Sequence, residues 1–104
     1  MKLMRLMILY DFPRNDQEIN KEISNFRKEL DSLGFYRFQY SVYTLLISRP
    51  EKAKEIEKKL KAYVPSNGIC ATILLTEKQF NNIKLLVGKY KPSEPLSYNQ
   101  LNLF

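Results

Sequence analysis

Apolar residues in the first third of the chain follow two patterns, one typical of a strand and one typical of a helix. Residues 3–10 form a near-continuous apolar run that stops shortly before Pro13. Such a run predicts a central strand buried on both faces. Five apolar residues then recur at intervals of four and three: Ile19, Ile23, Phe26, Leu30 and Leu33. This spacing predicts a helix that is capped by Asn15 or Asp16 and ends at Gly34.

The middle of the chain predicts two strands, a second helix and a further strand. Residues 35–48 are rich in aromatic and β-branched residues but too long for one strand, so a break is expected near residues 39–41. A helix is expected after Pro50, with its apolar face formed by Ala53, Ile56, Leu60 and Tyr63. Residues 69–75 then predict a second buried strand, and Thr76 is the expected N-cap of a short helix over residues 77–82.

The order of these elements predicts an α+β fold of the ferredoxin-like βαββαβ type, with both long helices on one face of an antiparallel sheet. Residues 1–91 would form this domain. Residues 92–104 differ in composition, with prolines followed by the alternating end Leu101-Asn102-Leu103-Phe104. This segment predicts an extra C-terminal strand that needs a sheet edge, which a second protomer could provide.

Composition excludes much of enzymology. The chain has no histidine, so imidazole bases, Ser-His-Asp or Cys-His pairs and histidine-containing zinc sites are impossible. Its three glycines are too few for a phosphate-binding glycine loop or a dinucleotide motif. The lone Cys70 is expected to be a small buried hydrophobe. The apolar N-terminal stretch is shorter than a signal or membrane segment, so a cytoplasmic protein is expected.

Charge indicates a polyanionic partner. Seventeen basic residues against eleven acidic residues give a net charge of +6, and a dimer would carry twice that. Nucleic acid is therefore the first partner to consider, although the excess could also be ordinary solubilising charge.

Four segments, in order along the chain, resemble the Cas2 family of CRISPR-associated adaptation proteins. They are residues 9–13 (LYDFP), 34–35 (GF), 38–43 (FQYSVY) and 76–80 (TEKQF), and the last of them is most similar to members from type II systems. The resemblance implies a two-fold dimer of ferredoxin-like protomers. It also implies that the dimer is a scaffold that holds a double-stranded prespacer DNA between dimers of the Cas1 integrase. Some relatives are instead described as metal-dependent nucleases acting on RNA or double-stranded DNA.

Asp11, the last residue of the first predicted strand, matches the family's candidate metal ligand and would be the catalytic residue of such a nuclease. Two copies facing each other across a dimer axis could share one Mg²⁺, which prefers carboxylate oxygens. The alternative is that Asp11 accepts hydrogen bonds within its own turn. Tyr10 and Ser41 could at most help to position a substrate.

Four basic residues are candidates for DNA binding. The resemblance implies that Arg14, in the loop after the first strand, contacts the DNA backbone. Lys21 and Lys28 align on the outer face of the first helix, and Arg37 lies in an aromatic strand. Exposed helical lysines are also common without any ligand.

The same fold offers another class of function, single-stranded RNA recognition through aromatic residues on the sheet. The aromatic candidates are Tyr36, Phe38, Tyr40 and Tyr43. The usual motif, a basic residue followed by alternating glycine and aromatic residues, is absent, so these residues are expected to pack within the sheet or a dimer.

Overall fold

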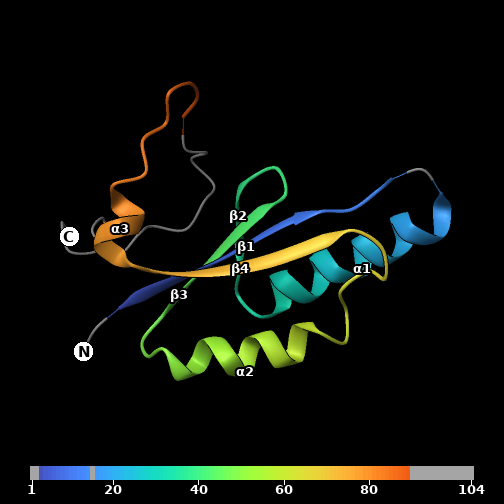
Figure 1. The fold of residues 1–104 in the computed structure, drawn as a ribbon, viewed down its shortest axis with the longest axis horizontal. Helices are drawn as coiled ribbons and strands as arrows, with labels where there is room; N and C mark the ends of the chain where they lie inside the picture. Colours follow the sequence, from blue (N-terminus) through green and yellow to red (C-terminus); the bar gives the residue numbers. More distant parts are fainter. Residues whose placement is uncertain (1–2, 15, 90–104) are drawn as a thin grey trace.

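The computed structural model describes residues 3–14 and 16–89 of the chain. Its elements, in order, are β1 (Met4–Asp11), α1 (Gln17–Ser32), β2 (Tyr36–Gln39), β3 (Val42–Ile47), α2 (Glu51–Leu60), β4 (Ile69–Thr76) and α3 (Glu77–Asn81) (Figure 1). The strands form one antiparallel sheet in the order β2-β3-β1-β4. The predicted ferredoxin-like arrangement is therefore confirmed. The predicted strand within residues 92–104, and hence the domain boundary after residue 91, lies outside the described residues.

Helices α1 and α2 cover one face of the sheet, and the main core lies between them and the strands (Figure 1). Alternate residues of β1 point into this core, and each long helix contributes an apolar stripe. The buried residues include Leu6, Ile8 and Tyr10 from β1, Ile23, Phe26 and Leu30 from α1, and Ala53, Ile56 and Leu60 from α2. The helical spacing of three to four residues is the one on which the sequence prediction relied, whereas β1 was expected from its continuous apolar run to be buried on both faces.

Local signals fix the ends of α1. The Asp16 carboxylate accepts a hydrogen bond from the Ile19 backbone N–H at 2.8 Å, which makes Asp16 the N-cap. The other predicted cap, Asn15, is outside the described residues. Gly34 has a φ of +97°, a conformation that side chains disfavour, and it ends the helical segment as predicted.

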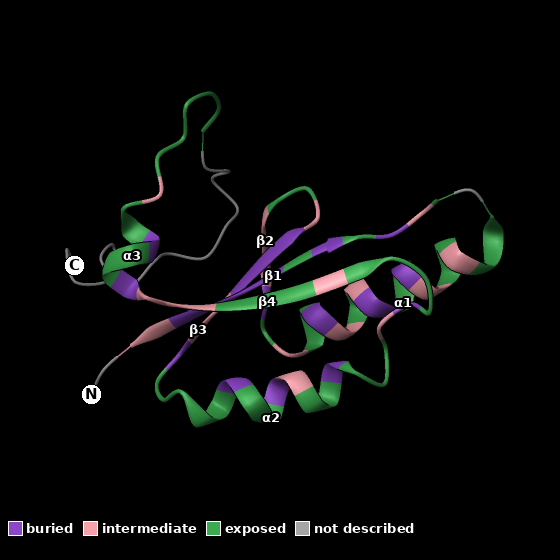
Figure 2. Cartoon of the chain, in the orientation of Figure 1, coloured by how far each residue is buried: buried purple, intermediate pink, exposed green. Residues whose placement is uncertain are grey.

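Two predictions about burial are wrong. Strand β4 is not a buried strand: Ile69 is 71% exposed and Ile73 is 48% exposed, and Figure 2 shows the strand as exposed or intermediate, with no buried part. The strand order puts β4 at the sheet edge, and neither long helix covers the face on which these two residues lie. Tyr63 does not extend the apolar face of α2, because the helix ends at Leu60 and Tyr63 lies in the following turn, 45% exposed.

Candidate functional site

The face of the sheet opposite α1 and α2, hereafter the open face, carries the predicted metal ligand. Asp11 is paired with Ile69, so both side chains lie on this face, next to the pair formed by Leu9 and Ala71. Leu9 is 41% exposed, and Asp11 is also exposed. A carboxylate therefore lies at the end of an apolar surface formed by Leu9, Ile69 and Ile73.

Asp11 lies outside any cluster of metal-ligating side chains in the described part of one protomer. No group of three potential metal-ligating side chains exists within the described residues. No residue of the described ranges donates a hydrogen bond to the Asp11 carboxylate, so the alternative role within its own turn gains no support there. Proteins can hold Mg²⁺ with one or two carboxylates, and waters complete its coordination. Asp11 would therefore fit an ion shared between two protomers only if a second copy brings its own Asp11 close.

The backbone beside Asp11 is closely packed against the turn that precedes β4. Gly68 has a φ of +115°, and a Cβ atom at this position would collide with the Asp11 carbonyl oxygen and the Phe12 ring. Only glycine satisfies both constraints. The backbone at the end of β1 therefore passes directly against residue 68.

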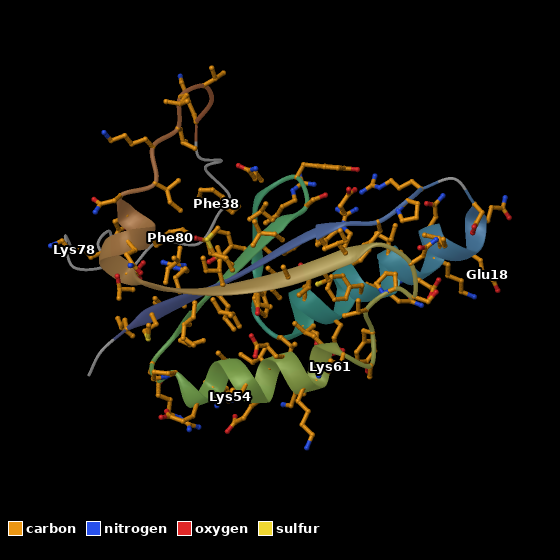
Figure 3. All side chains as sticks on the ribbon, in the orientation of Figure 1. Glu18, Phe38, Lys54, Lys61, Lys78 and Phe80 are labelled. Carbon is orange, nitrogen blue, oxygen red and sulfur yellow. The ribbon has the colours of Figure 1, made fainter. Side chains whose placement is uncertain are left out.

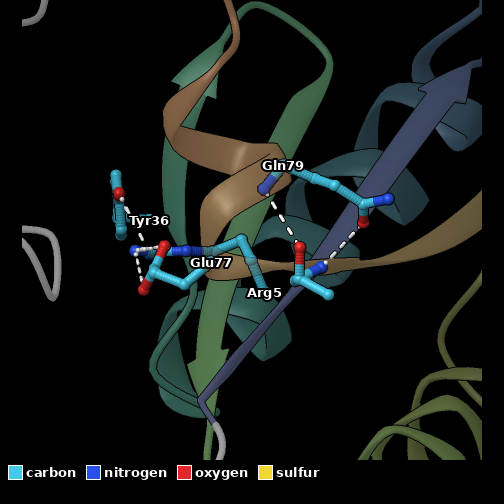
Figure 4. A network of polar contacts seen from close by, with 5 residues as sticks. Arg5, Tyr36, Glu77 and Gln79 are labelled. Atoms are coloured by element: carbon cyan, nitrogen blue, oxygen red, sulfur yellow. Dashed lines mark hydrogen bonds and ion pairs between the residues drawn. The ribbon is translucent and has the colours of Figure 1, made fainter.

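A buried ion pair fixes α3 on the other end of the open face (Figure 4). Arg5 is 1% exposed, and its Nη2 donates to both carboxylate oxygens of Glu77, at 3.0 and 3.1 Å. Its Nη1 donates to the Tyr36 hydroxyl at 3.3 Å, and its guanidinium lies 4.2 Å from the centre of the Phe80 ring. One arginine thus ties β1, β2 and α3 together.

The short helix itself is stabilised by a capping box. The Thr76 hydroxyl accepts a hydrogen bond from the Gln79 N–H at 3.0 Å, and the Gln79 side chain accepts one from the Thr76 N–H at 2.9 Å. Phe80 then packs against Phe38, with ring centres 5.5 Å apart (Figure 3). Because Tyr36 accepts a hydrogen bond from Arg5 and Phe38 packs against Phe80 of α3, the sheet does not display them as a base-stacking platform.

A second polar cluster lies where β1 ends and β2 turns into β3. It is formed by Tyr10, Arg14, Arg27, Tyr40 and Tyr43, and is hereafter called the arginine–tyrosine cluster. The Arg14 guanidinium lies 4.7 Å from the centre of the Tyr40 ring, and the Arg27 Nε donates to the Tyr43 hydroxyl at 3.3 Å. Residues from a loop, a helix and a hairpin therefore converge on one end of the molecule.

The electrostatics of this cluster keep its charge positive. Burial raises the pKa of the Tyr10 hydroxyl, an effect strengthened by Tyr43 and opposed by Arg27 and Arg14. The hydrogen bond from Arg27 to Tyr43 raises the pKa of the Arg27 guanidinium. At neutral pH Tyr10 is therefore uncharged and Arg27 cationic.

The other predicted DNA-binding residues lie apart from the cluster or at its edge. Lys21 and Lys28 are exposed on α1, and the structure gives neither a partner among the described residues. Arg37 is partly buried opposite Tyr43, so strand alternation separates it from its neighbours Tyr36 and Phe38. The sequence reasoning missed Arg5 and Arg27. The only signal for Arg27 was its position beside Phe26, at the edge of the apolar stripe of α1.

An open groove of about 440 Å³ lies between α2 and β4. Its lining residues are Ile8, Glu57, Leu60, Lys61, Val64, Cys70 and Thr72. The Thr72 hydroxyl donates to the Glu57 carboxylate at 2.6 Å, and burial raises the pKa of the Cys70 thiol. A protonated thiol is a poor nucleophile, so Cys70 is not suited to nucleophilic catalysis.

Residues 4–83 match the family model described as CRISPR associated protein Cas2. The chain belongs to the Cas2 family. It is 42% identical over 86 residues to a protein named CRISPR-associated endoribonuclease Cas2 from Ligilactobacillus salivarius (strain UCC118), covering 83% of this chain and 85% of that protein. A protein of the same name from Parvibaculum lavamentivorans is 35% identical over 101 residues, covering 97% of this chain and all of the relative.

A solved structure titled "Crystal structure of cas2" is similar with a TM-score of 0.60 and 21% identity, covering 90% of this chain and 97% of the solved chain. This similarity supports the fold. The family assignment confirms the resemblance drawn from the four segments and supports a CRISPR-associated role. None of the helices in the described ranges is long and apolar enough to cross a membrane.

Proposed function

We propose that this Cas2 protein acts in CRISPR adaptation as a dimeric scaffold that binds double-stranded prespacer DNA without sequence preference and bridges dimers of the Cas1 integrase. The observation that carries the proposal is a set of arginines without acidic partners. Arg14, Arg27 and Arg37 have no acidic partner within residues 3–14 and 16–89, whereas Arg5 and Arg49 do. Uncompensated arginines suit phosphate oxygens, which fix a duplex in position without reading its bases.

The open face supports dimerisation through a second copy. Leu9, Ile69 and Ile73 form an exposed apolar surface beside Asp11, and surfaces of this kind often mark protein interfaces. Pairing two such faces would bury the apolar residues and bring two Asp11 carboxylates towards one another. It would leave the arginine–tyrosine cluster of each protomer available to DNA. The predicted outcome is a dimer in light scattering that Ile73→Lys weakens and Lys54→Glu, on the exposed side of α2, does not.

DNA binding is proposed to use Arg14, Lys21, Lys28 and Arg37 against the phosphate backbone. Binding should be insensitive to sequence and fall steeply with salt, because each phosphate contact releases condensed counterions. Replacing Arg14 by alanine should reduce both the affinity and the salt slope. Weaker binding with an unchanged slope would contradict a direct phosphate contact for Arg14.

The bridging role is tested by size-exclusion chromatography with light scattering on the protein, its cognate Cas1 integrase and a short duplex. The expected product contains two integrase dimers around one dimer of this chain, and DNA should strengthen it. Absence of any association at low salt would contradict the scaffold proposal.

Residues 92–104 are proposed to lie at the dimer or integrase interface, because their alternating end suits addition to a sheet edge. A chain ending at residue 91 should lose one of the two assemblies. If both survive the truncation in light scattering, this assignment is wrong.

The alternative function is a metal-dependent endonuclease acting on single-stranded RNA or double-stranded DNA, favoured by the names of the relatives. Two Asp11 side chains would hold the Mg²⁺, which would supply charge stabilisation at a phosphate. Cleavage that persists through purification and requires Mg²⁺ should be lost in Asp11→Ala and kept in Asp31→Ala, a control at an exposed aspartate of α1. Equal cleavage by both variants would exclude Asp11 as the metal ligand.

A further inference from the structure

We infer that Tyr40 is a positioning residue that holds the Arg14 guanidinium for a DNA phosphate, and that Arg27, held by Tyr43, contacts a second phosphate. The inference rests on the proposed duplex binding and specifies how the chain would achieve it. The ligand is the phosphodiester backbone of a nucleic-acid duplex. Neither Arg27 nor Tyr40 stood out as a DNA-binding residue from sequence.

The backbone holds Tyr40 in place by an unusual turn. Ser41 has a φ of +65°, in the left-handed region that non-glycine residues seldom adopt. The Tyr10 N–H donates to the Ser41 carbonyl oxygen at 3.0 Å, which ties the hairpin tip to the end of β1. Strained backbone persists where its surroundings hold it, and here it fixes the hairpin tip beside the loop that carries Arg14.

The contact with Tyr40 leaves the donors of Arg14 available. Tyr40 is 59% exposed, so its ring lies outside the core. Among the described residues, the ring packs against the Arg14 guanidinium. A guanidinium stacked on a ring uses its flat face for the contact and keeps its in-plane N–H groups for an anion. The ring therefore restricts the arginine without consuming its hydrogen-bonding capacity.

Arg27 is held by a different contact with a similar result. Its Nε donates to the Tyr43 hydroxyl, and Tyr43 is itself buried in the core, 4% exposed. The terminal nitrogens of Arg27 have no partner within the described part of the chain. Both Arg14 and Arg27 lie close enough to act electrostatically on the Tyr10 hydroxyl. Two held cations around one neutral tyrosine suit neighbouring phosphates of one strand.

The test measures binding of a short end-labelled duplex by fluorescence anisotropy over a series of salt concentrations. Tyr40→Leu removes the aromatic ring and should weaken binding about 2- to 5-fold per protomer, the range given by a solvent-exposed cation–π contact. Tyr40→Phe keeps the ring and should bind as the unaltered protein does. Tyr63→Leu removes another exposed tyrosine, at a turn outside the cluster, and should have no effect.

Two further variants separate positioning from simple structural damage. In an Arg14→Ala background, Tyr40→Leu should cause no additional loss, because the residue it positions is gone. Arg27→Ala should lower the salt slope by about 0.9 for each phosphate contact removed. Far-UV circular dichroism of each variant checks that the fold is retained.

The outcomes distinguish this inference from the proposed function. If the unaltered protein does not bind the duplex, the proposed function fails and the inference with it. If it binds, the inference is overturned when Tyr40→Leu binds normally, when Tyr40→Phe is as weak as Tyr40→Leu, when the loss persists without Arg14, or when Arg27→Ala leaves the salt slope unchanged.

Discussion

Replacing Glu77 by alanine should destabilise the protein strongly, because it leaves Arg5 as a buried charge without its counter-ion. The Arg5 side chain is 1% exposed and that of Glu77 is 9% exposed, and the two share a pair of hydrogen bonds at 3.0 and 3.1 Å. Removing one partner from such a pair costs about 3–5 kcal/mol of unfolding free energy. The remaining contacts of Arg5, with the Tyr36 hydroxyl and the Phe80 ring, carry no negative charge.

An exposed ion pair in the same chain supplies the control. Glu55 lies 3.7 Å from Arg49 and 3.5 Å from Lys52, and all three side chains are about half exposed. Glu55→Ala should therefore cost less than about 1 kcal/mol. Both variants are compared by urea unfolding followed by far-UV circular dichroism, at one protein concentration because association adds to apparent stability.

A third protein tests the cause of the loss. Replacing Arg5 by methionine together with Glu77 by leucine removes both charges, so most of the stability lost in Glu77→Ala should return. The reasoning is refuted if Glu77→Ala costs no more than Glu55→Ala. It is also refuted if the double variant is as unstable as Glu77→Ala, since the loss would then not arise from an unpaired charge.

Three other predictions concern backbone strain and titration. Gly68→Ala should lower the urea midpoint of unfolding more than Gly34→Ala does. Both glycines have a positive φ, but only at position 68 would the new Cβ atom collide with backbone atoms, so equal effects would contradict this packing. The raised pKa of the Cys70 thiol should make its labelling by iodoacetamide at about pH 8.5 slower than that of a peptide thiol, and unfolding in urea should remove the difference. Equal labelling rates in the folded protein and the peptide would refute this prediction. Because the pKa of Tyr10 is raised in the folded protein, Tyr10 contributes stability that is fully present below the unfolded pKa of about 10 and is lost as pH rises through the folded pKa. The unfolding free energy of Tyr10→Phe should therefore fall less at alkaline pH than that of the unaltered protein. An equal fall in both proteins would exclude Tyr10 as the source.

The elements that the sequence predicted well depend on short-range signals. Helix α1 follows from its apolar repeat, the Asp16 cap and Gly34, all within about twenty residues. The hairpin break near residues 39–41 and the capping box at Thr76 are equally local. The core residues of α1 and, apart from Tyr63, of α2 could likewise be identified from their helical spacing, whereas the continuous apolar run of β1 indicated a buried strand without indicating which residues face the helices.

The features that escaped prediction depend on which strands become neighbours. Arg5 and Glu77 are separated by 72 positions, and their pairing requires α3 to fold back over β1. The apolar composition of β4 resembles that of a central strand, yet the strand order makes it an edge. The contact between Arg14 and Tyr40 joins a loop to a hairpin tip, and no residue pattern in either segment indicates it. Polar partners across a fold cannot be read from spacing.

The two ends of the open face have different environments, and the proposed functions differ accordingly. At one end, the ion pair of Arg5 with Glu77 and the packing of Phe80 hold α3 over the sheet. At the other end, Leu9, Ile69 and Ile73 remain exposed beside Asp11. In the proposed dimer, a second copy of the chain would bury this apolar surface, with the two Asp11 residues beside it. The contact proposed to make a dimer scaffold would thus also bring together the two carboxylates that the nuclease alternative requires, which is why assembly and cleavage must be measured separately.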